Sequence, residues 1–140
     1  MSKSTSELQK ELTSAPDLSR FLSENENNFD DRRFCELLQE MFQNSGLTKS
    51  SLAKRAGTSD VYLYQIFSGG RVPSRDRTLC LCFGLGATLE ETQELLKLSG
   101  YAQLYIKDRR DAIIMYGLTN ALDLRTINDR LYEEKEETLC

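Results

Sequence analysis

Side chains of the types that most often do chemistry in proteins are few in this chain of 140 residues. Histidine is absent, which removes the commonest general base and the commonest metal ligand together. The four cysteines form no Cys-x-x-Cys pair, so we expect free thiols in a reducing compartment rather than a structural zinc site. Gly84-Leu85-Gly86 begins like a dinucleotide-binding loop, but Leu89 stands where that loop needs its third glycine. The sequence therefore predicts no enzymatic activity, no metal and no cofactor.

Charge is distributed unevenly along the chain, although its sum of −4 argues against an affinity for polyanions. Residues 1–45 hold five basic and nine acidic side chains, residues 46–89 six basic and two acidic, and residues 90–140 seven basic and eleven acidic. A charged patch acts over about one Debye length, ~8 Å at physiological salt, so the basic middle segment can still attract polyanions. No apolar run approaches the ~20 residues of a membrane helix, and no secretory signal is evident. We expect a cytoplasmic protein with no membrane partner.

Apolar residues recur three and four positions apart along most of the chain, which predicts amphipathic helices and an all-α fold. Residues that favour helix N-caps precede several of these segments, namely Thr48, Ser59, Ser74, Thr88 and Asp123. The predicted helices span residues 4–14, 17–24, 31–44, 48–57, 60–67, 75–84, 88–98, 108–119 and 123–134. We expect residues 24–31 to be a connector and residues 133–137 to be a solvated, frayed run of charges.

The spacing of small and apolar residues between positions 49 and 66 indicates two helices that cross steeply. Ala53 is small enough for the closest approach of the two backbones, and Gly57 suits the tight turn between them. Leu47 and Leu52 are placed to form a hydrophobic staple at the start of the first helix. Leu63 and Ile66 bury one face of the second helix. Local propensity opposes this prediction, because residues 61–67 are β-branched and aromatic and precede a Gly-Gly pair, as in a strand followed by a turn.

Residues 47–89 resemble the lambda-repressor-like, XRE-type family of helix-turn-helix transcriptional regulators. The matching residues are Thr48, Leu52-Ala53, Gly57-Thr58-Ser59, Ile66, Gly70, Arg71, Pro73-Ser74, Leu79, Leu85-Gly86 and Leu89-Glu90-Glu91. The resemblance implies a five-helix lambda-repressor-like DNA-binding core at residues 29–100. A helical extension at residues 1–28 would precede this core, and a C-terminal helical hairpin at residues 101–140 would pack on it as a candidate dimerisation element. The N-terminal helices are the alternative element for the contact between protomers.

The resemblance also implies which residues would touch DNA, because the second helix of the motif enters the major groove in this family. The candidates for base reading are Ser59, Asp60, Val61, Tyr62, Tyr64, Gln65 and Ser68. The candidates for phosphate contact are Thr48, Lys49, Arg71, Arg75 and Arg77. Both tyrosines have an alternative role as half-buried rim residues, and we expect Lys54 and Arg55 to be plain surface. The implied function is sequence-specific binding of double-stranded DNA by a homodimer in the bacterial cytoplasm, associated with the nucleoid when bound.

Two residues depart from the family pattern. Phe67 stands where the family commonly has Glu, and we expect it to pack against the helix at residues 75–84 or against a flanking helix. Asp60 puts a negative charge at the helix start that would meet DNA, so either it reads a base or this surface has lost its DNA role. The alternative function is therefore a helix-turn-helix module that serves as a protein-protein interaction adaptor, with the acidic flanks as docking surfaces.

Overall fold

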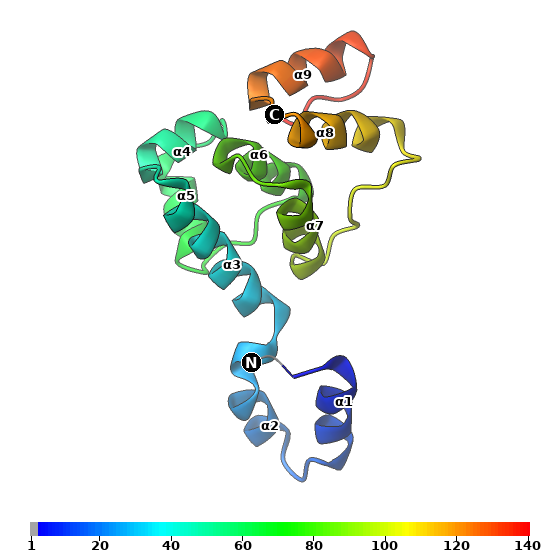
Figure 1. The fold of residues 1–140 in the computed structure, drawn as a ribbon. Coiled ribbons are helices and arrows are strands. Elements are labelled where there is room, and N and C mark those ends of the chain that lie inside the picture. The colour runs from blue at the N-terminus through cyan, green and yellow to red at the C-terminus, as the bar shows by residue number, and fades with distance from the viewer. Residues whose placement is uncertain (1–2) are drawn as a thin grey trace.

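The computed structural model describes residues 3–140, and all of their regular structure is helical. The elements are α1 (Thr5–Ser14), α2 (Leu18–Glu24), η1 (Glu26–Asn28), α3 (Asp30–Ser45), α4 (Lys49–Arg55), α5 (Asp60–Phe67), α6 (Arg75–Leu85), α7 (Leu89–Leu98), α8 (Arg109–Thr119) and α9 (Leu124–Glu133) (Figure 1). The predicted all-α class is confirmed. One detail differs, because the predicted connector at residues 24–31 contains the 3-10 turn η1 and the first residues of α3.

Side-chain caps explain where most of these helices begin. Among residues 3–140, eight of the nine α-helices have an N-cap side chain that accepts a hydrogen bond from a backbone N–H of the first turn, and α3 is the exception. For α5, Ser59 accepts from the Tyr62 N–H at 3.1 Å, while Leu63 and Ile66 are fully buried. Capping and burial outweigh the β-propensity of this segment, so the strand alternative for residues 61–67 is wrong.

One hydrophobic core runs through α3–α9, with α6 at its centre (Figure 1). Every residue of α6 from Thr78 to Gly84 is buried, as expected of a helix enclosed by neighbours on all sides. Gly84 lies where α6 meets α4, and a Cβ there would sit 3.0 Å from the Cβ of Ala56. The two helices can therefore approach closely only because this position has no side chain. None of the described helices is long and apolar enough to cross a membrane.

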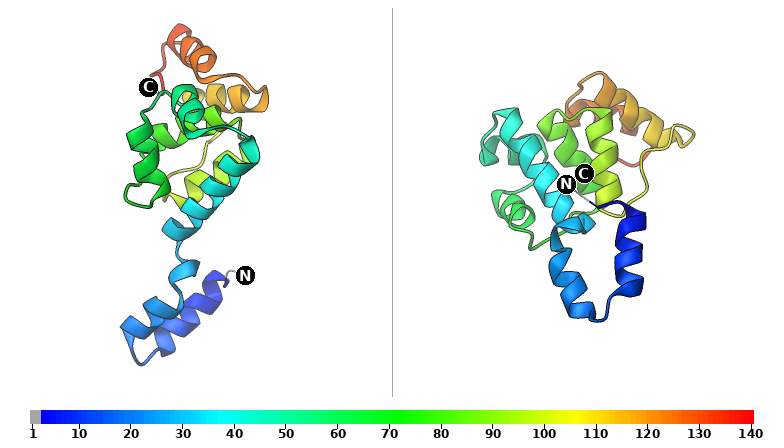
Figure 2. Two further views of the ribbon diagram at one scale, coloured as in Figure 1. Left: turned by 90° about the vertical axis from the view of Figure 1, so that its left-hand side faces the viewer. Right: turned by 60° about the horizontal axis from the view of Figure 1, so that its bottom comes forward.

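Helices α1 and α2 form a hairpin that stands off from the core and joins it through η1 and the start of α3 (Figures 1 and 2). A polar network ties the hairpin together: Lys3 Nζ donates to Glu11 Oε1 at 2.6 Å and to the buried Asn25 Oδ1 at 2.8 Å. All ten residues of α1 are described, and none is buried. The hairpin thus leaves much of its apolar surface in solvent, including Leu12, Leu18 and Leu22.

Helices α8 and α9 pack against α7 and α6 and complete the domain. Gly117 lets α8 approach α9, since a Cβ there would lie 2.7 Å from Ile127 Cδ1. The chain after α9 folds back on this hairpin, and Leu139 is buried with its N–H donating to Asn128 Oδ1 at 2.8 Å. Arg110 Nε also donates to the Glu137 carbonyl at 2.9 Å. The run of charges at residues 133–137 is largely exposed, as predicted, but the prediction that it is frayed is wrong, because its backbone is hydrogen-bonded and the segment that follows docks on α8 and α9.

Candidate nucleic-acid interface

Helices α4 and α5, with the turn between them, form the frame of the candidate interface. Thr48 caps α4 by accepting from the Ser51 N–H at 3.1 Å, and Ser59 caps α5. Gly57 adopts the left-handed conformation, with φ of 65°, and the next N–H, that of Thr58, donates to the Ala53 carbonyl at 2.9 Å. The residues that hold the two helices to the core are all at most 3% exposed, namely Leu52, Ala53, Leu63 and Ile66. Each capping and packing position of the frame is thus occupied by a residue suited to it.

The outward face of α5 carries the base-reading candidates. Val61 and Tyr64 are 67% and 66% exposed, so both can reach a partner without rearrangement. Asp60 is exposed in the first turn, where its carboxylate interacts favourably with the helix dipole. Ser59 and Ser68 are exposed, but each hydroxyl already bonds the backbone of α5: that of Ser59 accepts from the Tyr62 N–H and that of Ser68 donates to the Gln65 carbonyl. The structure thus brings Asp60, Val61 and Tyr64 together on one free surface.

Tyr62 occupies a different position from Tyr64. Its ring is half-buried and packs against the core, with Arg71 Cζ 4.6 Å and Arg77 Cζ 5.6 Å from the ring centroid. Cation–π contacts of this kind hold an arginine in place over an aromatic face. The structure therefore separates the two tyrosines: Tyr62 is a rim residue that supports two arginines, while Tyr64 faces solvent.

Arg71 and Gln65 are joined directly. Arg71 Nη1 donates to Gln65 Oε1 at 3.2 Å, across the turn that follows α5. Arg77, which also lies over the Tyr62 ring, has a different partner, since its Nη1 donates to the Gly57 carbonyl at 3.3 Å. This link between a candidate reader and a candidate phosphate contact was not foreseen from the sequence, since six positions across a Gly-Gly turn follow no helical or strand period.

Phe67 ends α5, and Lys49 at the start of α4 lies close to its ring. The Phe67 ring packs on Phe42 of α3, with centroids 5.1 Å apart, and Gln39 Nε2 donates to the Phe67 carbonyl at 3.1 Å. The expectation that Phe67 packs against the helix at residues 75–84 or a flanking helix is wrong, because the C-terminal end of α5 lies along α3. Lys49 Nζ lies 5.8 Å from the centroid of the same ring and remains exposed.

Arg75 is the phosphate candidate that the structure places elsewhere. Its guanidinium binds both carboxylate oxygens of Asp111, at 3.2 and 3.0 Å, and its Nε donates to the Ala102 carbonyl at 3.0 Å. Asp111, at the start of α8, is only 6% exposed. Arg75 therefore fastens the C-terminal hairpin to α6. The sequence did not predict this role for Asp111. The one indication was that an acidic residue shares the buried side of a helix with apolar residues such as Ile114 and Leu118.

A second ion pair offsets the loss of the Arg75 charge, so the net charge of residues 46–89 is unchanged. Arg110 binds Asp76 through two hydrogen bonds of 3.1 Å, so the only acidic residue of residues 46–89 besides Asp60 is neutralised from α8. With Arg75 and Asp76 both paired, the segment keeps five basic residues against one acidic residue. The basic residues are Lys49, Lys54, Arg55, Arg71 and Arg77.

Among residues 3–140, no group of three or more His, Cys, Asp or Glu side chains could hold a metal ion.

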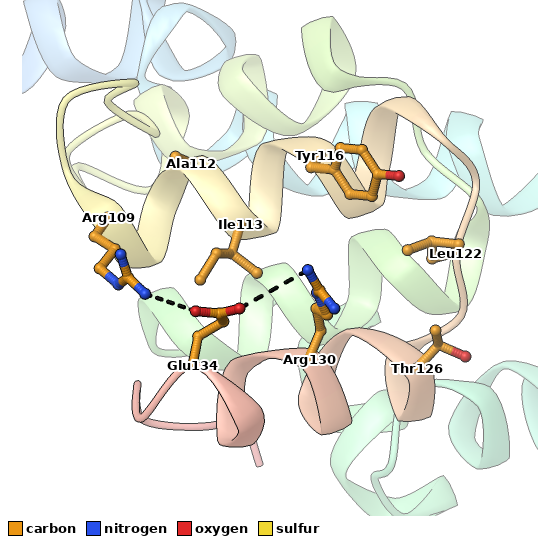
Figure 3. A pocket seen from close by; sticks show the side chains of 8 residues that line it. All are labelled: Arg109, Ala112, Ile113, Tyr116, Leu122, Thr126, Arg130 and Glu134. Atoms are coloured by element: carbon orange, nitrogen blue, oxygen red, sulfur yellow. Dashed lines mark hydrogen bonds and ion pairs between the residues drawn. The ribbon is translucent and has the colours of Figure 1, made fainter.

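A groove of about 650 Å³ runs between α8 and α9, away from this face (Figure 3). Apolar side chains, including Ile113 and Tyr116, form its wall on α8. One end is closed by ion pairs, in which Glu134 lies 2.6 Å from Arg109 Nη2 and 3.8 Å from Arg130 Nη2 (Figure 3). The outward part of the hairpin thus keeps exposed apolar surface, with Tyr116 60% exposed, in addition to the part packed on the core.

Comparison with known families identifies the segment that contains the candidate interface. Residues 33–95 match a family model described as a helix-turn-helix domain, which covers nearly all of α3 and continues into α7. This match is consistent with the XRE-type resemblance, and it contains the frame built by α4 and α5. A search among curated proteins and solved structures found no match.

Proposed function

We propose, from the helix-turn-helix domain at residues 33–95, that this protein binds double-stranded DNA sequence-specifically and regulates transcription. The observation that carries the proposal is the free outer surface of α5, flanked by the arginines anchored on Tyr62. Such a helix fits the major groove, with base-reading side chains near its N-terminus and positive charge beside the phosphates. Helix-turn-helix domains are typically non-enzymatic, which agrees with the lack of a catalytic constellation in the sequence.

Each candidate reader suits a particular base edge. Gln65 can donate to and accept from adenine, while Val61 and the Tyr64 ring can pack on thymine methyl groups. Asp60 can only accept, as from the amino group of cytosine. Because Arg71 already binds the amide oxygen of Gln65, we infer that it orients this side chain as well as attracting the backbone.

The phosphate contacts are assigned to Lys49, Arg71 and Arg77, with Thr48 at the start of α4. Arg75 is left out because its guanidinium is occupied by Asp111 and by backbone carbonyls. About three to six contacts per protomer give weak binding that falls steeply with salt. We therefore propose a homodimer that spans half-sites about 34 Å apart.

Two surfaces are candidates for the contact between protomers. One is the groove between α8 and α9 with Tyr116 at its edge, and the other is the exposed apolar side of the α1–α2 hairpin, with Leu12 and Leu18. Sedimentation of Tyr116→Arg and Leu12→Arg variants separates them. The variant that shifts the protein toward monomer identifies the interface, and two unaffected variants would contradict a dimer through either surface.

A binding titration tests the proposed DNA function. The full chain is titrated against fluorescent random-sequence duplex at several salt concentrations, beginning at low salt. Micromolar binding whose affinity falls linearly with the logarithm of salt concentration is the expected result. No binding at low salt, even at protein concentrations where the dimer forms, contradicts the proposal and favours the adaptor function.

Asp60 and the exposed leucines of the α1–α2 hairpin are the observations on which that second candidate rests. In either case we propose action in the bacterial cytoplasm, at the nucleoid when bound to DNA.

A further inference from the structure

Two thiols that are far apart in the sequence meet on the side of α6 next to the C-terminal segment. Cys80 Sγ and Cys140 Sγ are 3.4 Å apart, although 60 positions separate the two residues. Cys80 lies within α6 and is 1% exposed, whereas Cys140 is exposed. The pair therefore joins a buried thiol of the core to a thiol that solvent reaches.

The folded structure holds Cys140 in this place through several independent contacts. Leu139 is buried and its N–H is bound by Asn128, whose Nδ2 lies 3.7 Å from Cys140 Sγ. Arg110 donates to two carbonyls of the same segment, those of Glu137 and Thr138. On the other side, Cys140 Sγ lies beside Gly57 of the helix-turn-helix turn, since a Cβ added to this glycine would come within 3.4 Å of the sulfur. Proximity of the two thiols thus follows from the docking of the whole segment.

We propose that Cys80 and Cys140 are a redox-active pair that forms an intramolecular disulfide when a hydroperoxide reaches Cys140. The Cys140 thiolate attacks one oxygen of hydrogen peroxide and breaks the O–O bond, which yields a sulfenic acid and, after protonation, one water. The Cys80 thiolate then attacks the sulfenic sulfur, forms the S–S bond and releases the second water. The two sulfur atoms lose two electrons in total, the peroxide gains them, and both thiol protons end in water.

Exposure sets the order of these steps. Peroxide reaches Cys140 first, and Cys80 acts as the resolving thiol because it is buried beside it. Burial raises the pKa of Cys80 well above that of an ordinary thiol, so closure of the disulfide should accelerate as pH rises. Cys82, two positions along α6, points to another side of the helix and is fully buried, so peroxide does not reach it. This proposal is independent of DNA binding.

The disulfide would tie α6 to the segment that follows α9. It would close a loop that includes α7, α8 and α9, and so restrict the unfolded chain and oppose detachment of the C-terminal hairpin. We expect the oxidised protein to melt about 5–15 °C above the reduced protein, as estimated from loop closure in a chain of this length. A reductant such as dithiothreitol should reverse the shift.

The test treats the reduced full-length chain with hydrogen peroxide and follows thiols, intact mass and linked peptides. The expected product has two titratable thiols instead of four after unfolding, a mass lower by two hydrogen atoms, and a peptide that joins Cys80 to Cys140. Closure should speed up by up to tenfold per pH unit below the pKa of the attacking thiol.

Three variants complete the design. Cys140→Ser, an exposed substitution, should keep its melting temperature but form no internal disulfide, and Cys80→Ser should stop at the sulfenic or sulfinic acid of Cys140. The matched control Cys35→Ser should form the disulfide as the parent chain does. Overoxidation of Cys140 with Cys80 still reduced in the parent chain, or disulfides between chains only, would overturn the proposal.

Discussion

Replacing Asp111 with asparagine isolates the ion pair that fastens the C-terminal hairpin to the core. The Asp111 carboxylate accepts from Arg75 Nη1 at 3.2 Å, from Arg75 Nη2 at 3.0 Å and from the Tyr105 N–H at 3.0 Å. Asparagine keeps the shape but removes the charge and replaces one acceptor oxygen with an NH₂ donor. The guanidinium of Arg75 then faces a neutral group in a site from which water is largely excluded.

The magnitude follows from the exposure of the pair. Breaking a fully buried ion pair by removing one partner costs about 3–5 kcal/mol. The Asp111 side chain is 9% exposed but that of Arg75 is 23% exposed, so solvent screens part of the loss. We therefore expect Asp111→Asn to lower the free energy of unfolding by about 2–3 kcal/mol.

Urea unfolding of the full chain at pH 7 measures this change, with the slope on urea checked for constancy. The matched control is Glu24→Gln, which removes an exposed pair with Arg20 at 2.8 Å and should change the stability far less, because solvent screens this pair. If Asp111→Asn costs no more than the control, the assignment of Arg75 to structure is refuted and its candidacy as a phosphate contact returns.

Three further predictions concern packing, pH and DNA. Gly117→Ala should cost about 1–3 kcal/mol of stability in urea unfolding, because the added Cβ would lie 2.7 Å from Ile127 Cδ1. Burial raises the pKa of Cys82 from 9.0 to about 12, so the native state holds this proton more tightly than the unfolded state. This contribution to stability is therefore complete below pH 9 and is lost as pH rises toward 12, by about 1.4 kcal/mol per pH unit. Cys82→Ala should flatten this decline in a pH series of unfolding free energies. Arg71→Ala should flatten the salt dependence of DNA binding by about one unit of slope and also reduce sequence discrimination, while Arg75→Gln should leave the slope unchanged.

Each of these predictions has a control and an outcome that contradicts it. Gly46→Ala removes a glycine with no atom within 4 Å of its Cβ position, so it carries the cost of the left-handed backbone without a steric clash; equal stability of Gly117→Ala and the parent chain would show that the helices can separate freely. If the unfolding free energy declines equally at alkaline pH with and without Cys82, the decline comes from the titration of other groups. An Arg71→Ala variant that loses affinity but keeps full discrimination would disconnect this residue from base reading.

Local patterns were sufficient to predict most of the fold. Helix starts followed from hydroxyl and carboxylate caps such as Ser59 and Asp123, since a cap acts on backbone groups two or three residues away. The helix-turn-helix frame followed from Ala53 and Gly57, whose sizes are dictated by one crossing and one turn. These features involve residues close in sequence, so their physical causes are visible in the sequence itself.

The contacts that the sequence did not predict join residues from different helices. Arg75 meets Asp111 across 36 positions, and Cys80 meets Cys140 across 60, only because α8, α9 and the last segment dock on α6. Phe67 was assigned to the wrong neighbour because its direction depends on how α5 crosses α3. Such pairings depend on the angles at which helices pack, which no local spacing specifies.

Selection of binding sites from a random duplex library, followed by affinity measurements on single base-pair variants of the selected site, tests the central claim most directly. The parent chain should select a defined sequence, and Gln65→Ala should lose about 1–3 kcal/mol of discrimination at one base pair while keeping the others. The matched control Gln9→Ala, on the exposed surface of α1, should discriminate as the parent does. Enrichment of no sequence, or a Gln65→Ala variant with an unaltered preference at every position, would contradict the assignment of α5 as the reading helix.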